Sequence, residues 1–158
     1  MSFIFISYRR SDSYDVVSRI YDQLRESLGP EKVFRDIHSI PLGVDFRRYL
    51  RQAVEQCGIQ LVVIGPNWLQ ASDREGRRRL DDPNDWVRIE IESALGREIP
   101  VVPVLVNGAA MPRAEDLPEG LKDLAYRHGA QVRPDPDFHH DMGRLMGWIG
   151  KQFEKTLE

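Results

Sequence analysis

The sequence predicts an α/β domain in which helices cover both faces of a parallel sheet. Short apolar runs rich in β-branched and aromatic residues alternate along the chain with amphipathic stretches of helical period. The middle runs are apolar on both faces, which is typical of strands buried between two helical layers. The chain has 158 residues, the length of one domain, and it contains no internal repeat or interdomain linker. We therefore expect a single domain over residues 1–158.

The first half of the chain is expected to contain three strands and two helices. Asp12 is positioned to cap the first helix, which ends near Gly29. Asp45 is positioned to cap the second helix, whose apolar residues recur at helical spacing. A turn-rich loop precedes that second helix. The strands are expected at residues 3–8, 33–35 and 59–64, and the loop at residues 36–43.

The second half continues the alternation. The long polar stretch 70–83 is expected to be loop, because it offers no apolar face to bury. Asp85 opens a third helix that runs to about Gly96. A short helix is expected over residues 117–126. A final amphipathic helix follows, with Leu145, Trp148, Ile149 and Phe153 on its apolar face, and the last two strands are expected at residues 99–106 and 129–132.

Five strands in this arrangement favour the flavodoxin-like winding, with strand order 2-1-3-4-5. Ligands of such sheets bind beyond the carboxyl ends of the strands, at the switch point between strands one and three. The residues just after Tyr8 and just after Ile64 are therefore the first candidates for a site.

The switch point lacks the motifs of several enzyme classes. A phosphoacceptor receiver needs acids after strand one and an aspartate after strand three, and neither is present. The sequence contains no G-x-G-x-x-G fingerprint, no phosphate-binding G-x-x-x-x-G-K-[ST] loop and no G-x-S-x-G elbow. No Cys or His set has zinc spacing. We therefore expect neither a metal nor a bound cofactor.

Composition excludes further classes of function. The formal net charge is −3, so no global basic field recruits nucleic acid. No apolar run reaches the ~20 residues that span a bilayer. Cys57 is the one cysteine, which excludes an internal disulfide and fits a reducing compartment. The start of the chain does not have the pattern of a signal peptide. These features favour a cytoplasmic location, without nucleic-acid or membrane partners.

The mouth of the predicted switch point is basic and aromatic. Arg9 and Arg10 follow the first strand, where their guanidinium groups suit a diphosphate. The alternative is that they cap nearby carbonyls or bind surface acids. Trp68 follows the third strand and either stacks on a ligand ring or packs in the core.

The third helix contains the clearest pattern. Trp86 and Glu90 lie one turn apart, at one edge of the apolar stripe that the helix is expected to bury. Glu92 falls on the opposite, solvent-exposed face with Arg88. Glu90 is therefore expected to be half shielded beside an indole, a setting that suits contact with a nucleoside. The alternative is a boundary glutamate in a surface ion pair. The stripe itself consists of Val87, Ile91, Ala94 and Leu95.

Four blocks of the sequence resemble TIR domains, in family order and over nearly the whole chain. The first is Phe-Ile-Ser-Tyr-Arg-Arg at 5–10. The second is Phe-Arg-Asp at 34–36 with Ser-Ile-Pro-Leu-Gly at 39–43 and Phe46. The third is Asp-Trp-Val-Arg-Ile-Glu-Ile at 85–91, and the fourth is Ile-Pro-Val-Val-Pro-Val-Leu at 99–105. The Ser-Ile-Pro-x-Gly sequence of the loop at 39–43 is similar to that of bacterial TIR domains.

The resemblance implies roles for individual residues. Glu90 matches the catalytic glutamate of NAD-hydrolysing TIR enzymes. Arg35 is a departure, since an apolar or small polar residue is more usual there. Residues that the resemblance assigns to NAD+ binding are Tyr8, Arg9, Arg10, Asp36, Phe46 and Trp86. The loop residues that it assigns to assembly are Ile37, Ile40, Pro41, Leu42 and Gly43.

The resemblance implies cleavage of NAD+ at its nicotinamide–ribose bond, giving nicotinamide and ADP-ribose or a cyclic isomer. NAD+ is then a substrate rather than a cofactor. Self-association with other TIR domains, head to tail or as a filament, is implied to activate the enzyme in bacterial defence signalling. A module of this kind is expected to be one part of a larger chain or system. The alternative is a non-catalytic TIR adaptor that acts through homotypic association. A nucleoside-transferring enzyme on a related sheet has no support beyond the fold.

Overall fold

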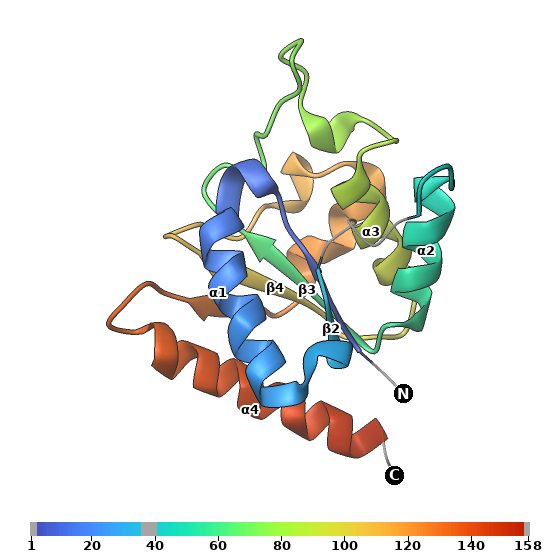
Figure 1. Cartoon of the computed structure of the whole chain (residues 1–158). Coiled ribbons are helices and arrows are strands. Elements are labelled where there is room, and N and C mark those ends of the chain that lie inside the picture. The colour runs from blue at the N-terminus through green and yellow to red at the C-terminus, as the bar shows by residue number, and fades with distance from the viewer. Residues whose placement is uncertain (1–2, 36–40, 157–158) are drawn as a thin grey trace.

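The sheet has the predicted winding. The computed structural model describes residues 3–35 and 41–156. Its five strands are all parallel and lie in the order β2-β1-β3-β4-β5 (Figure 1). The fold class predicted from the sequence is therefore confirmed. The strands are β1 (Ile4–Ser7), β2 (Val33–Phe34), β3 (Ile59–Ile64), β4 (Val101–Val106) and β5 (Ala130–Val132).

Helices cover both faces of this sheet (Figure 1). α1 and α4 pack over one face and α2 and α3 over the other, each pair enclosing its own apolar cluster. The α-helices are α1 (Arg10–Leu28), α2 (Phe46–Gln56), α3 (Trp86–Leu95) and α4 (Phe138–Thr156). Short 3₁₀ helices are η1 (Pro30–Lys32), η3 (Arg79–Asp81), η4 (Ala114–Asp116) and η5 (Glu119–Tyr126). No helix in the described part of the chain is long and apolar enough to cross a membrane.

The central strand β3 is buried along its whole length. Successive side chains of a strand point to opposite faces, so β3 contributes to both clusters. Leu61 and Val63 join the cluster under α1 and α4, whereas Val62 and Ile64 join the one under α2 and α3. This two-sided burial is why five of the six residues of the strand are apolar, with buried Gln60 as the exception.

Two of the three predicted helix caps are confirmed. The Asp45 side chain accepts a hydrogen bond from the Arg47 amide at 3.0 Å, and the Asp85 side chain accepts one from the Arg88 amide at 3.1 Å. The prediction for Asp12 is wrong, because the N-cap of α1 is Arg9, three residues earlier.

Asp12 instead connects the start of α1 to the end of β3. Its carboxylate accepts the amide N–H groups of Gly65 at 2.9 Å and of Asn67 at 2.8 Å. These amides belong to the turn that leaves β3, where the sheet no longer supplies partners. The link holds the first helix against the switch point between β1 and β3.

One loop prediction needs correction, and one helix prediction is made more specific. The stretch 70–83 is not wholly without structure, because an antiparallel bridge joins Ser72 to Arg78 and the turn η3 follows. Leu80 in that turn is fully buried, so one apolar side chain anchors the polar segment. The helix expected over 117–126 is the 3₁₀ helix η5, where Leu121 and Leu124 share one buried face at the i, i+3 spacing of that helix.

Candidate functional site

A pocket of about 350 Å³ opens at the carboxyl end of β1, where the sequence predicts a site. The beginnings of α1 and α3 form its walls, Arg35 lies just after β2, and Arg79 is the first residue of η3. Parallel strands bring their carboxyl ends to one edge of the sheet, which explains this position. The lining residues are Ile6, Tyr8, Arg9, Arg10, Ser11, Arg35, Arg79, Asp85, Trp86, Val87 and Glu90.

Glu90 points from α3 toward the end of β1 and is only 6% exposed. Ser7 Oγ donates a hydrogen bond to Glu90 Oε2 at 2.5 Å. The expectation of a half-shielded glutamate is therefore wrong in degree, because the strand end covers the side chain. Burial also excludes the alternative of a surface ion pair.

The environment of Glu90 disfavours its charged form. Burial raises the pKa of this carboxyl from an ordinary 4.5 to about 8, and the nearby charge of Asp85 adds to the increase. The hydrogen bond from Ser7 and the charge of Arg9 act in the opposite direction. At neutral pH Glu90 is therefore mostly the neutral acid, and a cation beside it would favour the carboxylate.

Arg9 forms a buried two-pronged ion pair with Asp85. Arg9 Nη1 donates to Asp85 Oδ1 at 2.7 Å and Nη2 to Oδ2 at 2.6 Å. Both side chains are less than 10% exposed. Because Asp85 also caps α3, this pair joins the start of α1 to the start of α3. Arg9 lines the pocket, but both its terminal nitrogens are used by Asp85, and its Nε is buried without a partner in the described structure.

Trp86 presents a supported aromatic surface to the pocket. Its ring stacks on that of Phe46, with centroids 4.3 Å apart and planes 20° apart. Phe46 thus packs beside Trp86 and is not itself among the lining residues. Trp68 is fully buried, so the packing alternative holds for that residue.

The basic residues of the mouth differ in their surroundings. The Arg10 guanidinium is exposed and lies 5.1 Å from the centre of the Tyr14 ring. Arg35, the departure from the family pattern, packs on α1, where it donates to Ser18 Oγ at 2.9 Å and lies 4.3 Å from the Tyr21 ring centre. This arginine, unusual for the family, therefore contributes contacts to α1. Tyr8 is largely buried and lines the pocket, and its contact with a substrate stays a prediction.

Part of the predicted loop can be located. Asp36, Ile37 and Ile40 lie outside the described residues. Pro41, Leu42 and Gly43 lie on the surface, and Leu42 is fully exposed. Gly43 has φ of +83°, a backbone conformation that side chains with a Cβ rarely adopt.

Sequence reasoning missed two partners of the site. Ser7 lies in the first block that resembles TIR domains, and its place at the end of β1 indicated the switch point, but no role was predicted for it. Asp85 was recognised as a cap but not as the partner of Arg9, 76 positions away in sequence. Arg79 lies in the stretch 70–83, for which no part in a site was predicted, and it lines the pocket. Among the residues that the structure describes, no group of three or more His, Cys, Asp or Glu side chains is arranged to hold a metal ion.

Comparisons with known proteins identify relatives of this chain. The family model described as "TIR domain" matches residues 4–146. The chain is 28% identical over 128 residues to "NAD(+) hydrolase sarm1" of Drosophila melanogaster. The match covers 80% of this chain and only 9% of that much longer relative. Among solved structures, the TIR domains in "Structure of the activated Roq1 resistosome directly recognizing the pathogen effector XopQ" have a TM-score of 0.69 at 17% identity, over 94% of this chain and 99% of theirs.

The raised pKa of Glu90 predicts a pH-dependent stability difference between the wild type and Glu90→Gln. The folded state binds an extra proton between pH 4.5, the ordinary pKa, and about 8. The contribution of Glu90 to the free energy of unfolding is therefore greatest below pH 4.5. It falls by up to about 1.4 kcal/mol per pH unit across that window. Glu90→Gln does not titrate at this position, so its stability relative to the wild type should increase as pH rises. Urea denaturation of both proteins from pH 5 to 8.5 measures the difference; a constant difference would contradict the buried carboxyl.

Proposed function

Because this chain belongs to the TIR domain family, we propose that it is an NAD+ nucleosidase that cleaves the nicotinamide–ribose bond. The observation that carries the proposal is the buried carboxyl of Glu90 in a pocket with an aromatic wall and a basic mouth. The similarity to an NAD(+) hydrolase supports it. The products are nicotinamide and ADP-ribose, or a cyclic isomer of ADP-ribose.

The reaction needs little acid–base chemistry from the protein. Glycosidases use two carboxyl groups because an alkoxide leaving group must be protonated. The nicotinamide of NAD+ is a cationic pyridinium, and it takes the electron pair of the broken C–N bond and leaves neutral. A single carboxylate beside the ribose can then stabilise the oxocarbenium-like centre. Water attacks this centre and loses a proton to give ADP-ribose, whereas attack by an adenine nitrogen gives a cyclic product.

Glu90 is the group that we assign to this role. Asp85 also lines the pocket, but its charge is neutralised by Arg9. The cationic pyridinium favours the Glu90 carboxylate when substrate enters, because opposite charges attract strongly in a poorly hydrated site. Ser7 acts as a positioning residue, since its hydrogen bond fixes one carboxylate oxygen at the end of β1.

The rest of the substrate is assigned to the pocket walls. Trp86, supported by Phe46, provides a flat face for a ring of the substrate. Arg10 at the mouth suits the diphosphate, and Tyr8 lines the same wall. Arg9 holds this wall in place through Asp85, and a direct contact of Arg9 with substrate stays a prediction. So does the predicted contact of Asp36.

We further propose that activity depends on self-association through the exposed loop. Leu42 is fully exposed and Val44 is 44% exposed, and apolar side chains gathered on a surface mark interaction sites. Phe46, four residues after Leu42, contacts Trp86, so a partner on the loop would act on one wall of the pocket. Head-to-tail contacts of this kind can extend into filaments. Defence signalling in bacteria is the proposed setting.

Glu90→Gln should lower the rate of nicotinamide release by roughly 10²–10³, the usual cost of losing one preorganised electrostatic contact. The amide keeps the size of the side chain and leaves Ser7 Oγ an acceptor. Glutamine is preferable to alanine, because burial means that truncation would leave a cavity and an unpaired hydroxyl.

Glu92→Gln is the matched control on the same helix. Glu92 pairs with Arg88 at 2.7 Å outside the pocket, so its variant should keep nearly full turnover. In the assay, each purified protein is incubated with NAD+ and the nicotinamide released is measured. Equal losses in the two variants would refute the assignment of Glu90. No release by the wild type at any protein concentration would favour the non-catalytic adaptor.

Leu42→Asp should remove the dependence of activity on protein concentration. If only an assembled minority is active, apparent specific activity follows its population and rises with concentration. A charge at the exposed tip should flatten that rise without unfolding the domain, because Leu42 makes no core contact. Specific activity measured over a hundredfold range of concentration tests this, with Arg48→Asp on exposed α2 surface as control. A constant wild-type value would show that the monomer is active.

A further inference from the structure

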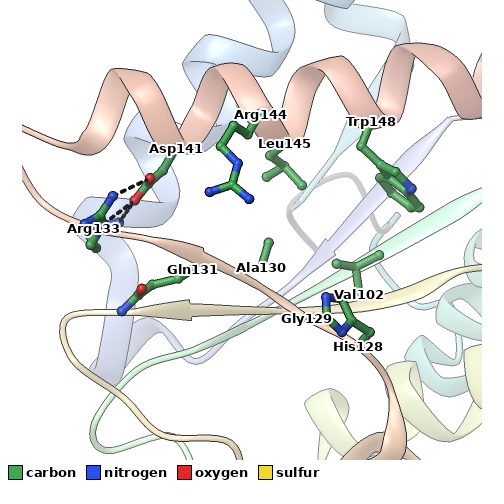
Figure 2. Close-up of a pocket in the computed structure, with 10 residues that line it drawn as sticks. All are labelled: Val102, His128, Gly129, Ala130, Gln131, Arg133, Asp141, Arg144, Leu145 and Trp148. Carbon is green, nitrogen blue, oxygen red and sulfur yellow. Dashed lines mark hydrogen bonds and ion pairs between the residues drawn. The ribbon is translucent and has the colours of Figure 1, made fainter.

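A second pocket, of about 530 Å³, lies between α4 and the edge strand β5. It shares no lining residue with the pocket that contains Glu90. Its volume falls within the usual range of small-molecule sites, roughly 300–1,000 Å³. Figure 2 shows side chains of α4 projecting toward β5 and the residues just before it. Nothing in the proposed reaction uses this space.

One face of α4 builds the upper wall in this view. Asp141, Arg144, Leu145 and Trp148 have the spacing i, i+3, i+4 and i+7, so they share a side of the helix (Figure 2). Leu145 is buried in the core, whereas Arg144 and Trp148 are accessible from the pocket. The floor is formed by Val102 of β4 and the backbone around β5.

One end of the pocket is closed by an internally satisfied ion pair. Asp141 accepts from Arg133 Nε at 2.9 Å, from Arg133 Nη2 at 3.0 Å and from the Arg133 amide at 2.9 Å (Figure 2). These bonds hold the pKa of Asp141 down at about 2. Arg133 also pairs with Asp137 at 3.7 Å, a residue that does not line the pocket, so this end contributes shape and no unpaired cation.

Arg144 supplies the uncompensated charge. Within residues 3–35 and 41–156 its guanidinium has neither a hydrogen-bond partner nor an ion-pair partner, and the other charged side chains that line the pocket are the paired Arg133 and Asp141. Figure 2 shows the guanidinium of Arg144 pointing into the space between α4 and β5. A guanidinium so placed offers its forked donors to an anion.

Trp148 supplies a ring surface one turn further along the helix. Its indole is partly exposed and projects toward Val102 and His128 (Figure 2). Trp148 Nε1 has no hydrogen-bond partner among the described residues. An aromatic face beside a cation is a surface on which a planar ring can stack while its anionic group meets the cation.

We propose that this pocket binds a small anion that carries a planar ring, of the size of a nucleoside monophosphate. The anionic group binds Arg144, the ring stacks on Trp148, and His128 and Gln131 offer further hydrogen-bonding groups. An apolar segment of a second copy fits less well, because it would desolvate Arg144 without providing a counter-charge. The proposal does not depend on cleavage of NAD+.

The test uses adenosine monophosphate and ¹⁹F NMR of protein labelled with 5-fluorotryptophan. The chain has three tryptophans, and single Trp→Phe variants assign their resonances. Trp148 reports on the second pocket, Trp86 on the first and buried Trp68 on the fold. The Trp148 resonance should shift saturably with adenosine monophosphate. Adenosine, which lacks the anion, and inorganic phosphate, which lacks the ring, should each act at least about tenfold more weakly.

Arg144→Gln should weaken the Trp148 response about tenfold or more, the equivalent of one charge-assisted hydrogen bond, while Arg48→Gln leaves it unchanged. The Trp86 response should be the same in both variants, which separates this proposal from that of the first pocket. A Trp148 resonance that does not move, or that moves equally in both variants, would overturn the proposal. So would a Trp148 resonance that changes with protein concentration alone, because that result identifies an interface between copies.

Discussion

The burial of Glu90 at the carboxyl end of β1 is the constraint around which the site is organised. A carboxyl group in such a place is costly to ionise, and its pKa rises to about 8. It stays oriented because Ser7 at the strand end holds one of its oxygens. The position of the strand end relative to α3 therefore decides where the carboxyl oxygens of Glu90 point. Contacts on either side of the pocket fix that position.

Two polar links hold the helices to the sheet edge. Asp12 joins α1 to the turn after β3, and Arg9 joins α1 to α3 through Asp85. Buried ion pairs are weak evidence for stability, because desolvation offsets much of their attraction. Their value here is geometric: the pair keeps the starts of two helices at a fixed separation. It also pairs the charge of Asp85, and for this reason the proposed function assigns the cationic substrate to Glu90.

The parts of the fold that depend on periodicity and turn chemistry were predictable from the sequence. The alternation of strands and helices gave the winding, and the caps at Asp45 and Asp85 followed from local chemistry. The helical wheel also gave the side of α3 on which Glu90 lies. The helical period could not predict how deeply Glu90 is buried, because it does not indicate which other element covers a residue. Pairings across long sequence separation, such as Arg9 with Asp85, have no local signal for the same reason.

The pH dependence of kcat/KM for NAD+ tests the central claim most directly, since this quantity reports the ionisation of groups in the free enzyme. If a buried Glu90 must be ionised to act, kcat/KM should rise about tenfold per pH unit from pH 6 and level off near the Glu90 pKa of about 8. Enzyme concentration should be held constant across the series, so that assembly does not vary through dilution. A flat profile between pH 6 and 8.5, with the fold intact, would contradict the claim that this carboxyl is both buried and catalytic.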